Sequence, residues 1–178
     1  MKLILTALNA KYIHTSLSVR CLARAVEDVC DCSIREYTIN DPVGEICSEL
    51  HRQKADCIAF SCYIWNIENI LKICSFLKKA NPKLTIVLGG YEAMYDSREL
   101  MEEHPYIDAV IRGEGEITLR EYIETLDSKK SLDCVSGITY RSDDEIIQNP
   151  DRTELCDINA LPFPYDDTID EIKNKIIY

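Results

Sequence analysis

The stretch Val87-Leu88-Gly89-Gly90-Tyr91-Glu92, followed one helical unit later by Val110-Ile111-Arg112-Gly113-Glu114-Gly115-Glu116, decides the fold of this chain. Each is an apolar run that stops abruptly in glycine. Glycine permits a positive φ, and its missing Cβ lets the backbone approach another group closely. Two such endings, one helical unit apart, predict neighbouring strands of a parallel sheet whose carboxyl ends share one edge. In open α/β sheets, ligands bind outside that edge.

Apolar strands and amphipathic helices alternate over residues 1–127. Strands are predicted over residues 2–8, 32–39, 57–60, 84–88 and 107–111, and helices over 17–29, 42–50, 67–77, 97–103 and 116–126. This rhythm indicates parallel strands joined by helical crossovers, and the short runs that are apolar throughout fit strands covered on both faces. We therefore predict an α/β fold with a doubly wound, five-stranded parallel sheet, the flavodoxin-like form of the Rossmann architecture.

The pattern changes after residue 127. Residues 137–148 alternate around Asp143-Asp144 and predict a β-hairpin, which Asn149-Pro150 ends. The segment 161–165 is expected to be extended, because X-Pro steps disfavour helix. Residues 170–178 are compatible with a helix but have no cap. We divide the chain into a (βα)5 domain over 1–127 and a hairpin with a linker over 128–178.

The composition restricts the function. The 178 residues carry a net charge of −11, which argues against a nucleic-acid or anionic-membrane surface because both require clustered Lys and Arg. No run approaches the roughly 20 apolar residues of a membrane span, and no signal peptide is recognisable. A cytoplasmic location is expected.

The nine cysteines predict reduced thiols. They occur within apolar periodic segments, as at Cys57 and Cys74, where Cys behaves as a small buried hydrophobe. Their number is odd, and the sequence contains no CxxC pair and no CxxxCxxC. We expect no disulfide framework and no zinc or iron–sulfur site within this chain.

Three common ligands of such a fold lack their motifs. A dinucleotide needs GxGxxG after the first strand, but residues 8–16 contain no glycine. A P-loop needs GK[ST], which is missing. A phosphoryl receiver needs acidic residues after the first strand and an Asp after the third, where this chain has Asn9 and Ser61-Cys62.

A large, mostly neutral ligand remains. Glycine backbones beside small polar groups and flat aromatic surfaces suit a macrocycle with amide side chains. An added side chain at Gly90 is expected to collide with such a ligand. The strand ends supply the candidate contacts Asn9, Tyr12, Thr15, Ser61, Tyr63, Trp65, Gly89, Gly90, Tyr91 and Gly113.

Taken together, five motifs resemble the N-terminal cobalamin-binding domain of B12-dependent radical SAM proteins. In chain order they are Gly89-Gly90, Arg112-Gly113-Glu114-Gly115-Glu116, Gly137-Ile138-Thr139-Tyr140-Arg141, Asn149-Pro150 and Leu161-Pro162-Phe163-Pro164. The resemblance covers nearly the whole chain. It implies a cobalamin cofactor held at the carboxyl ends of the strands.

The resemblance also implies a longer enzyme. In that family a radical SAM barrel follows the domain, with a CxxxCxxC motif for a 4Fe–4S cluster and S-adenosylmethionine. The expected partner of this domain is its own barrel, and the expected chemistry is methyl transfer or another B12-assisted radical reaction. Without the barrel we expect no radical chemistry. Two alternatives remain open: a non-catalytic flavodoxin-like sensor or interaction domain, and a binder of FMN or another nucleotide.

The sequence departs from other B12 domains after the first strand. Many resemble a D-x-H-x-x-G pattern whose His ligates cobalt, but His14 has neither the Asp nor the Gly. We do not expect His14 to be a ligand, although imidazole can ligate cobalt. The Ser of a Ser-x-Leu pattern is Ser61, placed to contact the nucleotide tail. Glu116 fits a helix N-terminus, and Glu114 is kept as a candidate cofactor contact.

Overall fold

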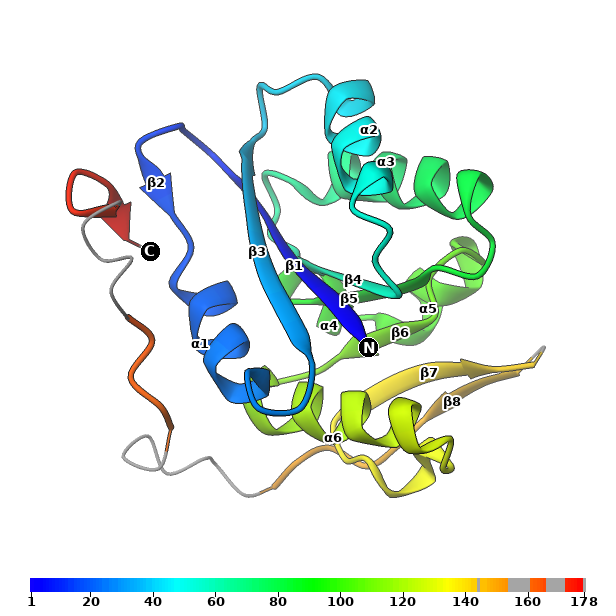
Figure 1. The fold of residues 1–178 in the computed structure, drawn as a ribbon. Coiled ribbons are helices and arrows are strands. Elements are labelled where there is room, and N and C mark those ends of the chain that lie inside the picture. The colour runs from blue at the N-terminus through cyan, green and yellow to red at the C-terminus, as the bar shows by residue number, and fades with distance from the viewer. Residues whose placement is uncertain (144, 154–160, 166–171, 178) are drawn as a thin grey trace.

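A seven-stranded sheet organises the chain. The structure is a computed structural model that describes residues 1–143, 145–153, 161–165 and 172–177 (Figure 1). The strand order is β3-β1-β4-β5-β6-β7-β8. The strands of this sheet are β1 (Lys2–Asn9), β3 (Asp31–Thr38), β4 (Cys57–Ser61), β5 (Thr85–Gly89), β6 (Ala109–Ile111), β7 (Ile138–Ser142) and β8 (Glu145–Gln148).

The first five strands in this order are parallel, and helices connect each of them to the next one along the chain. The helices are α1 (Leu17–Val26), α2 (Val43–Arg52), α3 (Ile67–Ala80), α4 (Tyr91–Met94), α5 (Ser97–Glu103) and α6 (Gly115–Ser128). A 3-10 turn, η1 (Leu132–Cys134), precedes β7. The predicted doubly wound, flavodoxin-like fold is confirmed.

Alternating side chains divide the core into two layers, because successive residues of a strand point to opposite faces. Leu3 and Leu5 of β1 pack with α1 and α6, whereas Ile4 and Leu8 pack with α2 and α3. Figure 1 shows these two pairs of helices on opposite faces of the sheet. No helix in the described ranges is long and apolar enough to cross a membrane.

The predicted hairpin is β7 and β8, and it extends the main sheet. β7 pairs antiparallel with β6, with Val110 opposite Thr139, and β8 pairs with β7. The hairpin therefore continues the sheet past residue 127, where we placed the domain boundary. The boundary itself stays a prediction.

Several local predictions differ from the structure. The strand expected over 107–111 begins at Ala109, and the helix expected to reach residue 29 ends at Val26. The short helix α4 was not predicted. Within 170–178, where we considered a helix, Ile176–Ile177 forms β9, which pairs with β2 (His14–Thr15). Residues 166–171 and 178 lie outside the described residues, and 161–165 contain no helix or strand.

Candidate cofactor-binding site

A cavity of about 340 Å³ lies at the carboxyl edge of the sheet, between α1 and α6. Its size falls at the lower end of the roughly 300–1,000 Å³ typical of small-molecule sites. It lies near the switch point of the strand order: the chain passes from β1 to β3 on one side of β1 and then returns to β4 on the other side. The position is therefore the one where open α/β sheets bind ligands.

Small side chains create this cavity. On the face that α1 and α6 cover, β4 carries Ala59 and Ser61 and β5 ends in Gly89. On the opposite face the same strands carry the large side chains Phe60 and Leu88. The sheet is thus fully packed on one face and hollow on the other near its carboxyl edge.

The cavity walls are mainly apolar and come from three elements. Val19 and Leu22 of α1 face Leu119 of α6 across the opening, and Leu5 and Val87 of the sheet lie below them. An apolar pocket of this kind suits a flat aromatic or aliphatic group better than a phosphate.

Serine hydroxyls supply polar groups at the cavity. Ser18 Oγ lies 3.3 Å from Ser61 Oγ, and both residues line the cavity. Ser16 Oγ lies 2.9 Å from Ser18 Oγ. Ser16 is the N-cap residue of α1, but its side chain does not cap the helix. The hydroxyls instead connect the start of α1 to the end of β4.

The two consecutive glycines after β5 have different constraints. Gly90 has a φ of 95° and a ψ of 168°, a region essentially restricted to glycine. A Cβ there would lie 2.5 Å from the carbonyl oxygen of Cys62. At Gly89 the nearest atoms to a Cβ belong to Ile111, at 3.8 Å. A side chain at position 90 would therefore strike the protein's own backbone, and the expected collision with a ligand stays a prediction.

Gly113, after β6, also has a positive φ of 75°, but a Cβ would have no neighbour within 4 Å. The backbone conformation at position 113 therefore favours glycine, although there is space for a side chain. The adjoining Glu114 is the N-cap residue of α6, and Glu116 lies in its first turn. Carboxylates there complement the helix dipole.

Arg112 fixes the loop that leads from β6 into the cavity. Its buried guanidinium pairs with Asp151 and donates a hydrogen bond to the carbonyl of Asn149. Its backbone N donates to Gly137 O at 2.7 Å. The Arg of the Arg-Gly-Glu-Gly-Glu motif therefore attaches the cavity loop to the hairpin.

Residues 4–123 match the family described as the B12 binding domain. The chain belongs to this B12-binding family. The cobalamin-dependent radical SAM methyltransferase TokK of Streptomyces tokunonensis is 32% identical over 111 residues, which are 62% of this chain and 16% of that protein. The anaerobic magnesium-protoporphyrin IX monomethyl ester cyclase of Synechocystis sp. is 35% identical over 91 residues, 51% of this chain and 18% of that protein.

Solved structures share the fold of this B12-binding domain. The radical enzyme OxsB, with aqua-cobalamin and S-adenosylmethionine bound, superposes with a TM-score of 0.81 at 21% identity over 99% of this chain and 26% of OxsB. TsrM of Kitasatospora setae, with cobalamin and a 4Fe–4S cluster, has a TM-score of 0.71 at 14% identity over 90% of this chain and 30% of TsrM. The chain spans less than a third of each relative and structure named here.

The B12-binding domain brings seven of the eleven candidate contact residues to the cavity. These are Ser61, Tyr63, Gly89, Gly90, Tyr91, Gly113 and Glu114. Tyr63 stacks on Trp65, with ring centroids 4.6 Å apart. Tyr91 is 74% exposed at the edge. The role of each residue in cofactor binding stays a prediction.

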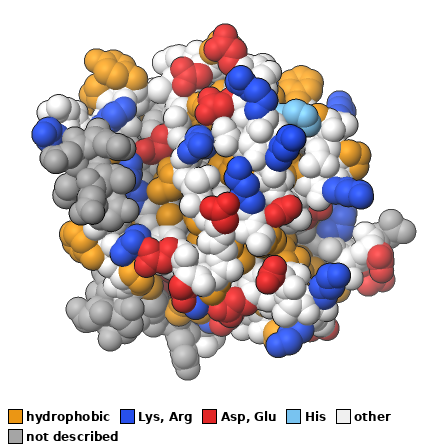
Figure 2. Space-filling model, viewed as in Figure 1, with side chains coloured by type: hydrophobic (Ala, Val, Ile, Leu, Met, Phe, Trp, Pro, Cys, Tyr) orange, Lys and Arg blue, Asp and Glu red, His pale blue; other side chains and the backbone are white. Residues whose placement is uncertain are grey.

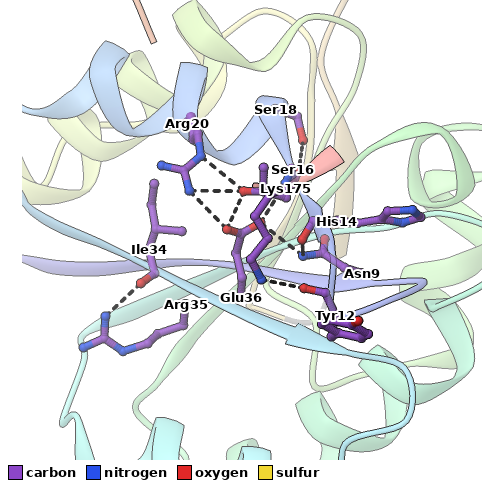
Figure 3. Close-up of polar contacts among 11 residues, drawn as sticks. Asn9, Tyr12, His14, Ser16, Ser18, Arg20, Ile34, Arg35, Glu36 and Lys175 are labelled. Carbon is purple, nitrogen blue, oxygen red and sulfur yellow. Dashed lines mark hydrogen bonds and ion pairs between the residues drawn. The ribbon is translucent and has the colours of Figure 1, made fainter. Parts of the chain in front are cut away.

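The other four candidates do not line the cavity. Trp65 follows β4, and Asn9, Tyr12 and Thr15 lie at the end of β1 or in the loop after it. Tyr12 is 77% exposed. Asn9 and Thr15 are buried, and both donate hydrogen bonds to Glu36. The ring of His14 points away from Glu36 in Figure 3. In this structure Asn9 and Thr15 thus contact another part of the protein instead of the cavity.

Sequence reasoning missed Asn66, a buried amide that anchors the loop after β4. Its Oδ1 accepts from the backbone N of Tyr63 at 2.8 Å. Its Nδ2 donates to Leu8 O at 3.0 Å and to Ser61 O at 3.1 Å. One side chain therefore joins the ends of two neighbouring strands beside the cavity. Its sequence signal is its place just before a helix, where Asn is preferred.

Cys62, directly after β4, is a buried thiol. Burial raises the pKa of the Cys62 thiol far above its usual value, so this residue stays protonated at neutral pH. In the part of the chain that the structure describes, no group of three or more His, Cys, Asp and Glu side chains is placed to hold a metal ion. On the face in Figure 2, acidic and basic side chains are interspersed.

The cavity fits part of a cobalamin. Its apolar walls suit an aromatic nucleotide base, and the nearby hydroxyls of Ser18 and Ser61 suit the polar groups of a nucleotide. The open space at Gly113 and the exposed ring of Tyr91 leave room at the edge for a flat macrocycle.

Proposed function

We propose that this chain is the cobalamin-binding part of a B12-dependent radical SAM enzyme. The observation that carries the proposal is the apolar cavity between α1 and α6, which opens beside Gly89 and Gly113 in a domain of the B12-binding family. The names of its relatives include radical SAM methyltransferases, which favours this function over a flavin-binding or sensor domain.

In this proposal the nucleotide tail of cobalamin occupies the cavity. Leu22 and Leu119 pack against the base from the two helices, and Val87 lies beneath it. The corrin ring lies outside the edge, where Tyr91 and the Gly113 loop contact it. With its base held by Leu22, Val87 and Leu119, cobalamin would be bound with that base away from cobalt. We propose no cobalt ligand from His14.

The complete enzyme, in this proposal, adds a radical SAM barrel after this domain. The basis is that a relative named as a radical SAM methyltransferase, TokK, extends far beyond the matched region, which is only 16% of its length. The barrel would hold the 4Fe–4S cluster and S-adenosylmethionine, and it is the proposed partner of the carboxyl edge. Bound cobalamin supplies a cobalt centre that can carry a methyl group. The proposed location is the cytoplasm.

A retention experiment tests the cofactor. The protein is mixed with hydroxocobalamin or with FMN, passed through a desalting column and examined by visible absorption. Corrinoid bands that elute with the protein, at one cofactor per chain, are expected, and FMN should elute separately. Retention of FMN alone would favour a flavin-binding domain. Retention of neither would contradict cofactor binding by this chain.

A further inference from the structure

The carboxylate of Glu36 is the meeting point of four hydrogen-bond donors (Figure 3). Its Oε1 accepts from Asn9 Nδ2 at 3.2 Å and from the backbone N of Ser16 at 2.7 Å. Its Oε2 accepts from Thr15 Oγ1 at 2.7 Å and from Arg20 Nη2 at 3.2 Å. Two donors on each oxygen use the full acceptor capacity of a carboxylate.

Glu36 is unusual because it is a charged residue on the side of β3 that faces the core. Glu36 has the same alternation phase as Cys32 and Ile34, whose side chains pack against the core under α1. Its side chain is only 20% exposed. A charge held this far from water needs strong partners, and hydrogen bonds to charged groups are the strong ones. The ion pair with Arg20 supplies a countercharge.

Glu36 fixes both ends of one loop. Residues 9–16 connect β1 to α1, and the bonds to Asn9 and Ser16 hold the first and last of them. Asn9 Nδ2 also donates to His14 O at 3.0 Å across the loop. The loop follows β1 at the switch point of the sheet, where ligands bind in this architecture.

The same contacts continue to the cavity. Ser16, whose backbone N donates to Glu36, has its Oγ 2.9 Å from Ser18 Oγ. Ser18 Oγ lies 3.3 Å from Ser61 Oγ, and both of these residues line the cavity. Glu36 itself is not a lining residue. It therefore reaches the site only through the loop and the first turn of α1.

We propose that Glu36 is a positioning residue: its carboxylate holds the 9–16 loop and the start of α1 in the arrangement that cobalamin requires before the cofactor binds. The inference rests on the proposed function, because it names what organises that same site. A loop already in place costs less ordering free energy on binding, and tighter binding results.

The test compares Glu36→Gln with Asp108→Asn. Glutamine keeps the size of Glu36 but turns one acceptor oxygen into a donor group, which opposes the two donors on that side. Asp108 is a matched control: it is a half-buried carboxylate, 31% exposed, that accepts from Lys78 Nζ at 2.8 Å and from Ile86 N at 2.7 Å. It lies at the amino end of the sheet, away from the cavity.

Two measurements separate positioning from general stability. We expect Glu36→Gln to weaken binding of hydroxocobalamin at least about tenfold in an absorbance titration. Amide hydrogens of residues 10–16 in the cofactor-free protein should exchange faster. Asp108→Asn should change neither quantity. A second variant, Thr15→Val, removes one donor to Glu36 and should give a smaller loss of affinity with a smaller increase in exchange.

The outcomes are distinct. Equal affinity and equal exchange in Glu36→Gln and the unsubstituted protein would overturn the inference alone. The same loss of affinity in Asp108→Asn would overturn it too, because the effect would then be one of general stability. An unsubstituted protein that binds no hydroxocobalamin would overturn the proposed function and this inference with it.

Discussion

Two adjacent glycines at the end of β5 meet different requirements. Gly90 is needed by the fold, because its backbone conformation and its contact with Cys62 exclude a side chain. Gly89 has no such constraint and lines the cavity. A sequence shows two glycines as equivalent, and only the geometry of the neighbouring backbone separates the structural residue from the one that borders the site.

Gly90→Ala should lower the free energy of unfolding by about 1–3 kcal/mol from backbone strain alone, with a further cost from the clash with Cys62. The control is Gly44→Ala in helix α2, where nothing lies within 4 Å of an added Cβ. Alanine in an exposed helix is favoured over glycine by about 0.5–1 kcal/mol. Urea denaturation of the two variants measures both effects.

A stabilised Gly90→Ala protein would show that the loop after β5 relaxes around a side chain. The strict glycine requirement would then be wrong, and the glycine at position 90 would need another explanation.

Among the elements, α3 shows how a sequence pattern becomes a packed face. Ile70, Cys74 and Leu77 are buried against the sheet, as their helical spacing predicts. Leu71 packs against the same cluster but is only partly buried. Phe76, on the opposite side of the helix, is 53% exposed.

Ile70→Ala should therefore cost about 2–5 kcal/mol of unfolding free energy, the usual cost of emptying a buried aliphatic site. Phe76→Ala on the same helix should cost far less, because most of its ring already contacts water. Equal losses of stability in a denaturant titration would contradict the orientation of α3.

The sequence predicted the elements well where a hydrophobic period was long, as in α3 and α6. It was least informative where contacts between distant segments decide the structure. The pairing of β2 with β9 joins His14 to Ile176, and no local pattern of two residues encodes it. The short α4 after Gly90 was missed for a similar reason, since four residues are too few to show a helical period.

The candidate site was also predictable only in part, because local patterns mark the strand ends but not the contacts between distant segments. Glycines and small residues at strand ends indicated the edge of the sheet at which the cavity lies. The sequence did not predict which side chains line the cavity and which contact other parts of the protein. That distinction depends on hydrogen bonds such as those that Asn9 and Thr15 donate to Glu36. One signal existed: a glutamate in the buried phase of an alternating strand, which needs partners to be tolerated.

At the scale of the whole molecule, the two ends of the sheet have different properties. At the amino end, Lys78 of α3 forms an ion pair with Asp108, the residue before β6. The cavity lies at the opposite, carboxyl end. The segments that follow β4, β5 and β6 line the cavity at that end. The hairpin β7–β8 holds the last of these segments through Arg112. The residues that line the cavity are thus gathered at one edge of the sheet.

Trp65, the only tryptophan in the chain, provides a reporter at that edge. Its ring stacks on Tyr63, which lines the cavity. Cobalamin absorbs where tryptophan emits, so a bound cofactor should quench this fluorescence. The titration uses free N-acetyltryptophanamide to correct for absorption by unbound cobalamin.

The most direct measurement is this fluorescence titration with hydroxocobalamin for the unsubstituted protein, Gly89→Val and Gly44→Val. An added Cβ at position 89 would lie at the cavity in ordinary contact with Ile111, at 3.8 Å, whereas an added Cβ at position 44 in helix α2 would have nothing within 4 Å. We predict saturable quenching at one cobalamin per chain, weakened at least about tenfold by Gly89→Val and unchanged by Gly44→Val. Quenching that does not saturate, or that Gly89→Val leaves unchanged, would contradict cobalamin binding at this cavity.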